Sequence, residues 1–171
     1  MMIVHELGHV LAAWLTGGGV ERVVLHPLRL SRTDVAPNPH PHVVVWAGPL
    51  LGVLLPVGVW AACRMRGFAH AYLLRFFAGF CLIANGVYLG MGGFDHIGDA
   101  GDMLAHGSPH WLLWLFGLGA VPAGLWLWHG QGVHFGLGGA AHTHLRSVAY
   151  WTFGLALAII LCECLFFAVS M

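Results

Sequence analysis

Residues 1–19 read MMIVHELGHVLAAWLTGGG, an apolar run in which two histidines and one glutamate stand among aliphatic side chains before three glycines. His5 and His9 are four positions apart, so on an α-helix their imidazoles share one face and lie one turn apart. Glu6 lies beside them in the pattern H-E-x-x-H. This pattern is typical of a zinc site in which both histidines bind the metal and the glutamate accepts a proton from the attacking water.

The acidic residue in this run needs a physical explanation. An ionised glutamate inside an apolar helix costs on the order of several kcal/mol unless it has a partner or meets water. A bound metal and its water would supply that partner, so we expect a metal site here in preference to a structural histidine pair. Catalytic zinc usually has three protein ligands, and an anionic third ligand is favoured beside two neutral imidazoles. The candidates in this chain are Asp95, His96, Asp99 and Asp102.

The composition indicates a membrane protein. Of 171 residues, 58% are hydrophobic and 8% are charged, whereas soluble domains carry about 25% charged residues. A soluble globule cannot bury so much apolar surface, and a disordered chain would be rich in charge. Seven arginines balance seven acidic residues, so no basic surface for nucleic acid is expected.

Hydropathy predicts an all-α membrane protein with about five transmembrane helices, at residues 1–17, 43–62, 71–92, 109–129 and 147–170. The first helix is too short for a hydrocarbon core of about 30 Å, so we expect the reading frame to begin upstream of Met1. The arginines divide almost evenly between the two sides, and the positive-inside rule therefore favours neither orientation.

The connecting segments also carry signals. Val20–Leu30 alternates as a strand or hairpin does, and Pro37, Pro39 and Pro41 predict a loop after it. A short turn is expected at 63–70, a polar glycine-rich segment at 93–108 and a Gly/His-rich loop at 130–146. In that loop, His142 and His144 form a weak metal-binding pattern. Glu163 lies deep in the last apolar run, and an acid in such a place is a functional candidate.

HELGHVLAAWLTGG, followed by a strand-like stretch and then WAGPLLG, resembles the membrane-embedded site-2-protease class of zinc metallopeptidases. In that family H-E-x-x-H lies on the first core helix, a Gly-Pro motif on the next, and an aspartate further on is the third ligand. The resemblance covers roughly residues 1–106. It implies zinc binding by His5 and His9 and a catalytic role for Glu6. Gly48 and Pro49 are implied to position substrate, although a proline in a membrane helix also has a plain role as a kink.

The resemblance also orders the candidates for the third ligand. Asp99-Ala100-Gly101-Asp102-Met103-Leu104 aligns best with the family's Asp-Gly motif when Asp99 takes the ligand position, and Asp102 is the alternative. Asn85 corresponds to the family's substrate-positioning asparagine. Here the chain departs from the family pattern, because no proline follows Asn85 at the usual place and the stretch to Asp99 is longer.

Taken together, the sequence predicts a single polytopic domain over residues 1–171, with a metallopeptidase-like core at 1–106 and further spans at 109–129 and 147–170. The expected function is zinc-dependent intramembrane endopeptidase activity on membrane proteins or peptides, in the lipid bilayer of a prokaryotic cell membrane. The alternatives are a catalytically silent protease-like scaffold and a metal-handling membrane protein. The intact Glu6 argues against the scaffold, and the few ionisable residues in the other spans argue against transport.

Overall fold

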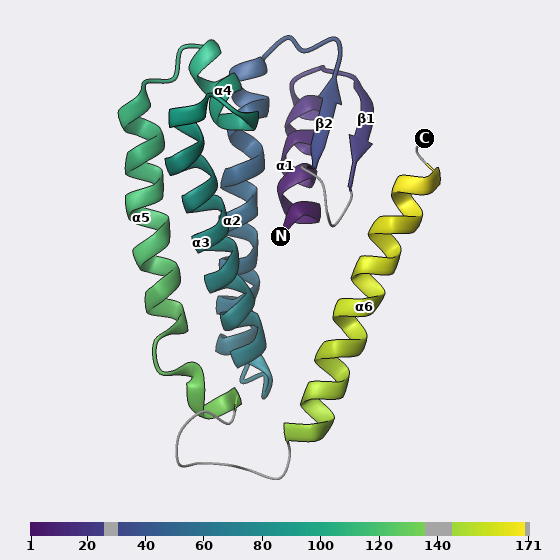
Figure 1. Ribbon diagram of the computed structural model, residues 1–171, viewed down its shortest axis with the longest axis vertical. Coiled ribbons are helices and arrows are strands. Elements are labelled where there is room, and N and C mark those ends of the chain that lie inside the picture. Colours follow the sequence, from purple (N-terminus) through teal and green to yellow (C-terminus); the bar gives the residue numbers. More distant parts are fainter. Residues whose placement is uncertain (26–30, 136–144, 170–171) are drawn as a thin grey trace.

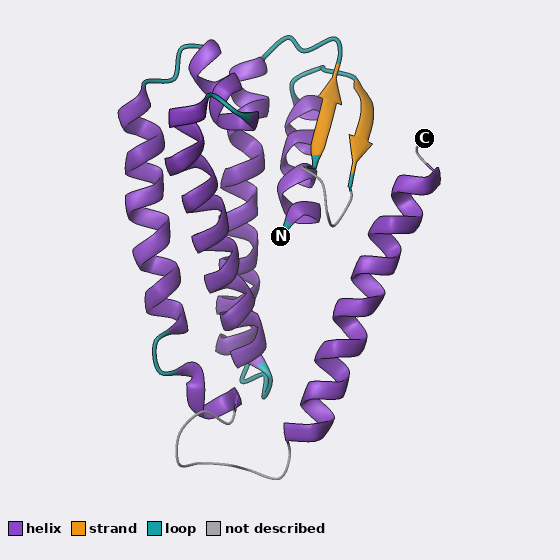
Figure 2. Cartoon of the chain, viewed as in Figure 1, coloured by secondary structure: helices purple, strands orange, loops and turns teal. Residues whose placement is uncertain are grey.

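The computed structural model describes residues 1–25, 31–135 and 145–169, with side chains for all of these except 145–148 and 166–169. Its elements follow in the order α1 Met2–Leu15, β1 Val20–Val24, β2 Arg32–Val35, α2 Pro41–Met65, α3 Ala71–Asp95, α4 Gly98–Ala105, α5 His110–Trp128, η1 Gln131–Phe135 and α6 Leu145–Val169. The predicted fold class, helical with a small hairpin between the first two long helices, is confirmed (Figure 2).

Most of the helices form one bundle, and α6 lies apart from it (Figure 1). α2, α3 and α5 run side by side, and α4 crosses one end of them (Figure 1). α1 lies against the upper half of α2, and the hairpin lies against α1. Among the described residues, α2, α3 and α5 are long and apolar enough to cross a membrane, while α1 and residues 149–165 of α6 are shorter apolar helices. Many large apolar side chains on these helices are exposed, as expected for surfaces that face lipid.

Helix boundaries differ from the sequence-based predictions in three places. Pro41, expected in a loop, is the first residue of α2, because its missing N–H and fixed φ suit the first helical position. α2 continues to Met65, into the predicted turn at 63–70. The predicted polar segment at 93–108 contains the end of α3 and the whole of α4. α4 forms because Ala100 and Met103 can both be buried on one face of a helix.

The first helix ends as its glycines predict. Gly17 has φ +79°, and the N–H of Gly18 donates to the carbonyl of Ala13, which is a typical glycine-based helix end. The chain then enters β1, which pairs antiparallel with β2. Strand structure is observed for Val20–Val24 of the predicted segment, and residues 26–30 lie outside the described residues. The His142 and His144 pattern also lies outside them.

Glycine permits close packing between α3 and α5. A Cβ at Gly124 on α5 would lie 2.7 Å from the Gly79 carbonyl oxygen and 2.7 Å from a carbon of Ile83 on α3. A Cβ at Gly117 would lie 2.9 Å from the Gly86 carbonyl oxygen. Small residues let backbones approach closely in membrane helices, where packing is a main source of association energy. These contacts fix α3, the helix that carries Asn85, against the rest of the bundle.

The end of the bundle farthest from α4 is closed by polar and aromatic contacts (Figure 1). Arg75 on α3 donates hydrogen bonds to the carbonyl oxygens of Trp126, at 3.4 Å, and His129, at 3.0 Å. Cations suit the carbonyl end of a helix, so Arg75 caps α5. The indole N–H of Trp128 donates to the Phe76 carbonyl, and the two rings stack.

We expect Gly124→Val to weaken the α3–α5 contact, because the larger side chain overlaps the backbone of α3. The free energy of unfolding should fall by roughly 1–3 kcal/mol, measured by SDS titration of the protein in mixed micelles. Gly119→Val is the matched control, since a Cβ at Gly119 on the same helix meets nothing within 4 Å. Equal unfolding midpoints for the two variants would contradict this account of the packing.

Candidate metal centre

α1 presents the three residues of the H-E-x-x-H motif to the interior of the protein. His5, Glu6 and His9 are 5%, 3% and 6% exposed. The two imidazole rings lie on one helix face with their centroids 5.0 Å apart, as the four-residue spacing predicts. Burial of this many polar groups in one turn requires partners from other elements.

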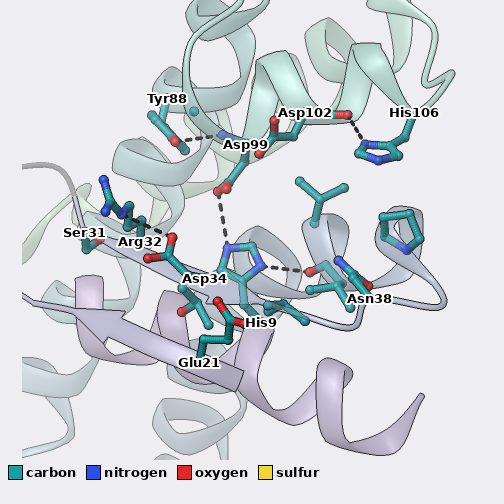
Figure 3. Close-up of a pocket in the computed structure, with 16 residues that line it drawn as sticks. His9, Glu21, Ser31, Arg32, Asp34, Asn38, Tyr88, Asp99, Asp102 and His106 are labelled. Carbon is teal, nitrogen blue, oxygen red and sulfur yellow. Dashed lines mark hydrogen bonds and ion pairs between the residues drawn. The ribbon is translucent and has the colours of Figure 1, made fainter. Parts of the chain in front are cut away.

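Asp99 reaches both rings from α4, where it lies in the first turn. Its Oδ2 is 2.6 Å from Nε2 of His5 and 3.4 Å from Nε2 of His9, and Figure 3 shows the contact with His9. The potential ligand atoms of the three residues all lie within 4.8 Å of one another. Two imidazole nitrogens and one carboxylate oxygen are a donor set that suits catalytic zinc.

The far side of each ring has a hydrogen-bond acceptor. Nδ1 of His5 donates to Oδ1 of Asn85 at 2.8 Å, and Nδ1 of His9 donates to the carbonyl oxygen of Val44 at 2.8 Å. With Nδ1 of each ring bound to an oxygen on another helix, Nε2 is the nitrogen that faces Asp99. Such partners on the outer nitrogen commonly orient metal-binding histidines, so the arrangement fits a divalent metal.

The charge on Asp99 also fits a metal ligand. Burial alone would raise the pKa of the Asp99 carboxyl, but hydrogen bonds from His5 and His9 and the charges of their rings outweigh burial and lower this pKa to about 2. The carboxylate is therefore ionised at neutral pH. It places a negative charge directly against two imidazole nitrogens, where a cation would be stabilised.

Asn85 contacts a histidine rather than the open cavity. It is completely buried on α3. Its amide nitrogen donates to the carbonyl of Cys81 at 2.8 Å, which leaves Oδ1 facing His5. The sequence-based prediction gave Asn85 a role in positioning substrate. The contacts observed orient the His5 ring, and the role in positioning substrate stays a prediction.

Gly48 provides the space that His9 occupies. A Cβ at Gly48 would overlap Nε2 and Cε1 of the His9 ring. Gly8 is equally constrained, because a Cβ there would lie 2.8 Å from Cα of Gly48. Pro49 is fully buried within α2. The Gly-Pro motif thus lies against the centre, and sequence reasoning missed that Gly48 accommodates a candidate ligand.

Glu6 has a partner on the hairpin. Thr33 of β2 donates from Oγ1 to Oε2 of Glu6 at 2.7 Å. Nothing in the sequence motif pointed to Thr33, because it lies 27 positions away on a different element. The hairpin therefore covers α1 and binds the acidic residue of the H-E-x-x-H motif directly.

A cavity of about 600 Å³ opens beside this centre (Figure 3). His9 and Asp99 lie on its inner wall, and residues 31–35 of the hairpin line another side. Tyr88 on α3 also lines the cavity, and its hydroxyl oxygen accepts the backbone N–H of Asp99 at 3.1 Å. The cavity gives a molecule outside the protein access to His9 and Asp99.

The other candidates for the third ligand lie elsewhere. Asp102 is exposed and lines the cavity, and its backbone carbonyl accepts a hydrogen bond from His106. Asp95 and His96 are exposed at the end of α3. Among the described residues, the structure groups Asp99, and none of these three, with His5 and His9. Glu163 is buried on α6 and is not part of this group.

The sequence pattern that defines the Peptidase M50B-like family matches residues 1–91, just over half of the 171-residue chain. The matched range contains His5, Glu6, His9 and Gly48 and ends before Asp99. The family match therefore does not bear on Asp99, whose grouping with the two histidines comes from the structure. No curated protein and no solved structure matches the chain.

We expect Asp99→Ala to lower the affinity for a divalent transition metal by more than 100-fold, beyond the roughly 10–100-fold typical of residues outside the ligand set. Asp102→Ala should cost at most about tenfold, because its carboxylate lies outside the ligand group. Metal content after identical purification and dialysis measures both. If Asp102→Ala lost its metal and Asp99→Ala kept it, Asp102 and not Asp99 would be the third ligand.

Gly48→Ala should disturb the same centre without removing a ligand. The added methyl group overlaps the His9 ring, so metal affinity should fall by roughly 10–100-fold. Gly58→Ala on the same helix is the control, because a Cβ there meets nothing within 4 Å. Competition with a chelating dye measures both affinities. If the two variants bind metal equally well, the proposed position of the ring is wrong.

Proposed function

The chain belongs to the Peptidase M50B-like family, and on this premise we propose that it is a zinc-dependent endopeptidase that hydrolyses peptide bonds of membrane-associated substrates. The observation that carries the proposal is the convergence of His5, His9 and Asp99 beside the buried carboxylate of Glu6. The three apolar helices of spanning length support an integral, multi-pass location, and we place it in a prokaryotic cell membrane.

In this proposal His5, His9 and Asp99 are the residues that would hold zinc. Three protein ligands leave one position for the reacting molecules, as catalytic zinc sites require. A zinc ion there would supply positive charge to polarise the scissile carbonyl and acidify the attacking water. Asn85 and the Val44 carbonyl keep both rings in the orientation that this binding needs.

Glu6 is the proposed general base and, later, the general acid. Thr33 holds one oxygen of its carboxylate, which leaves the other oxygen to accept the proton of the attacking water. The same carboxyl group then delivers that proton to the leaving amine, so the residue ends the cycle in its starting state. The position of Glu6 next to His5 keeps the base beside the ligands without making it one.

We further propose that the substrate enters as an extended strand beside β2. In the described sheet β2 pairs with β1 on one side, and residues 31–35 line the cavity that contains His9 and Asp99. An edge strand can form backbone hydrogen bonds with an added peptide. A membrane-spanning substrate would have to unwind locally before its peptide bonds reached the metal-binding residues.

Glu6→Gln tests this function against a catalytically silent scaffold. We expect peptide hydrolysis to fall by about 10²–10⁴-fold, because an amide cannot accept the proton, while zinc content stays at the wild-type level. Cleavage of a panel of single-span membrane peptides in proteoliposomes, followed by mass spectrometry, measures the rate. Glu21→Gln, which alters an exposed acid on the same cavity, is the control. Undiminished cleavage by Glu6→Gln would overturn the mechanism.

A further inference from the structure

Tyr88 lies beside the candidate centre and has no part in the functions assigned so far. It projects from α3 into the cavity that His9 and Asp99 also line (Figure 3). Its ring meets the His5 ring edge to face, with the centroids 5.9 Å apart and an interplanar angle of 74°. One face of the cavity is therefore made by a phenol in contact with a candidate metal ligand.

The hydroxyl group of Tyr88 uses its oxygen but not its hydrogen in the bond to Asp99. The backbone N–H of Asp99 donates to it at 3.1 Å, so the hydroxyl is the acceptor. A tyrosine hydroxyl keeps its proton at neutral pH and can donate one hydrogen bond at the same time. That donor is available to a molecule in the cavity.

The loop before α4 is shaped around this hydroxyl. Gly98 has φ +57°, a conformation that L side chains rarely adopt. A Cβ at Gly98 would overlap the hydroxyl oxygen of Tyr88. Glycine at this position thus allows the hydroxyl to lie at the start of α4, one residue from the carboxylate of Asp99. The donor is held in place before any substrate arrives.

Several other donors around the cavity are already engaged. Arg32 pairs with Asp34 at 3.2 Å and its side chain is 65% exposed. His106 donates from Nδ1 to the Asp102 carbonyl. Nδ1 of His9 donates to Val44 and its Nε2 faces Asp99. Among the described residues that line the cavity, Tyr88 offers a fixed, neutral donor next to the candidate ligands.

We propose that Tyr88 is a catalytic residue that donates a hydrogen bond to the carbonyl oxygen of the scissile peptide bond as that oxygen gains negative charge. This inference rests on the proposed endopeptidase function. No proton is transferred, and the phenol is unchanged at the end of the reaction. A fixed donor in a water-poor site stabilises such charge more than a solvated one does, because it needs no reorientation.

A purely structural role makes a different prediction. If Tyr88 only held the Asp99 backbone in place, Tyr88→Phe would displace Asp99 and lower zinc content. If Tyr88 donates to the substrate, the same variant keeps its zinc and loses rate. Metal content and rate, measured on one preparation, therefore separate the two roles.

The test compares the full-length Tyr88→Phe variant with wild type in four measurements: zinc content, kcat, KM and the Kd of a phosphinic peptide, whose tetrahedral anion resembles the charged intermediate. We expect unchanged zinc and KM, kcat lower by about 10²–10³-fold, and weaker phosphinic peptide binding. Gly98→Ala, which displaces the hydroxyl while keeping the phenol, should lose kcat and phosphinic peptide affinity in the same way. Tyr72→Phe is the control. Tyr72 lies near the first residue of α3, far along the helix from Tyr88, and its ring stacks on that of His134.

Three results would overturn the inference. Wild-type kcat in Tyr88→Phe would show that the hydroxyl donates nothing to the reaction. Loss of zinc in Tyr88→Phe would assign the residue to positioning Asp99. Unchanged binding of the phosphinic peptide would place the hydroxyl away from the charged oxygen. A wild-type protein that holds no zinc and cleaves no peptide would refute the proposed function itself. Zinc content and cleavage are therefore measured on wild type before any variant is made.

Discussion

The hydrogen bonds from Nδ1 of His5 and His9 to oxygens on α3 and α2 are the constraint on which the rest of the site depends. They fix the orientation of both rings and direct both Nε2 atoms to one point. That point can be shared only if α1 lies very close to α2, which Gly8 and Gly48 allow. The same requirement holds α3 in register, because Asn85 must reach His5 from that helix. The orientation of the two rings thus depends on the same close packing of α1, α2 and α3 that holds the helices together.

Much of this architecture follows from local sequence. Hydropathy located all of the long helices, and the spacing of His5 and His9 placed both rings on one face. Asp99 was selected by resemblance to a family motif, and the structure brings it to the two histidines. These features are visible because periodicity and short motifs report on neighbours within a few turns. The helix boundaries were less accurate, since the burial of Ala100 and Met103 that forms α4 depends on contacts with other elements.

What the sequence did not reveal consists of contacts between distant residues. Asn85 is 80 positions from His5, and Thr33 is 27 positions from Glu6. A glycine that accommodates a ring, such as Gly48, looks the same in a sequence as one that only bends a helix. Tyr88 lies in an apolar run, and no sequence motif marks it as a candidate. Each of these roles is set by which elements meet, and one sequence alone contains no direct measure of that.

The bond between Thr33 and Glu6 ties the hairpin to the acidic residue in a way that affects selectivity. β2 is both the strand beside the cavity and the element that holds one oxygen of Glu6. A peptide that adds to β2 along its length would restrict the motion of that strand and so of the carboxylate. A peptide that pairs poorly would leave the carboxylate with a wider range of positions. Discrimination between peptides would then appear in the turnover of bound molecules as well as in their affinity, because recognition and proton transfer share a single strand.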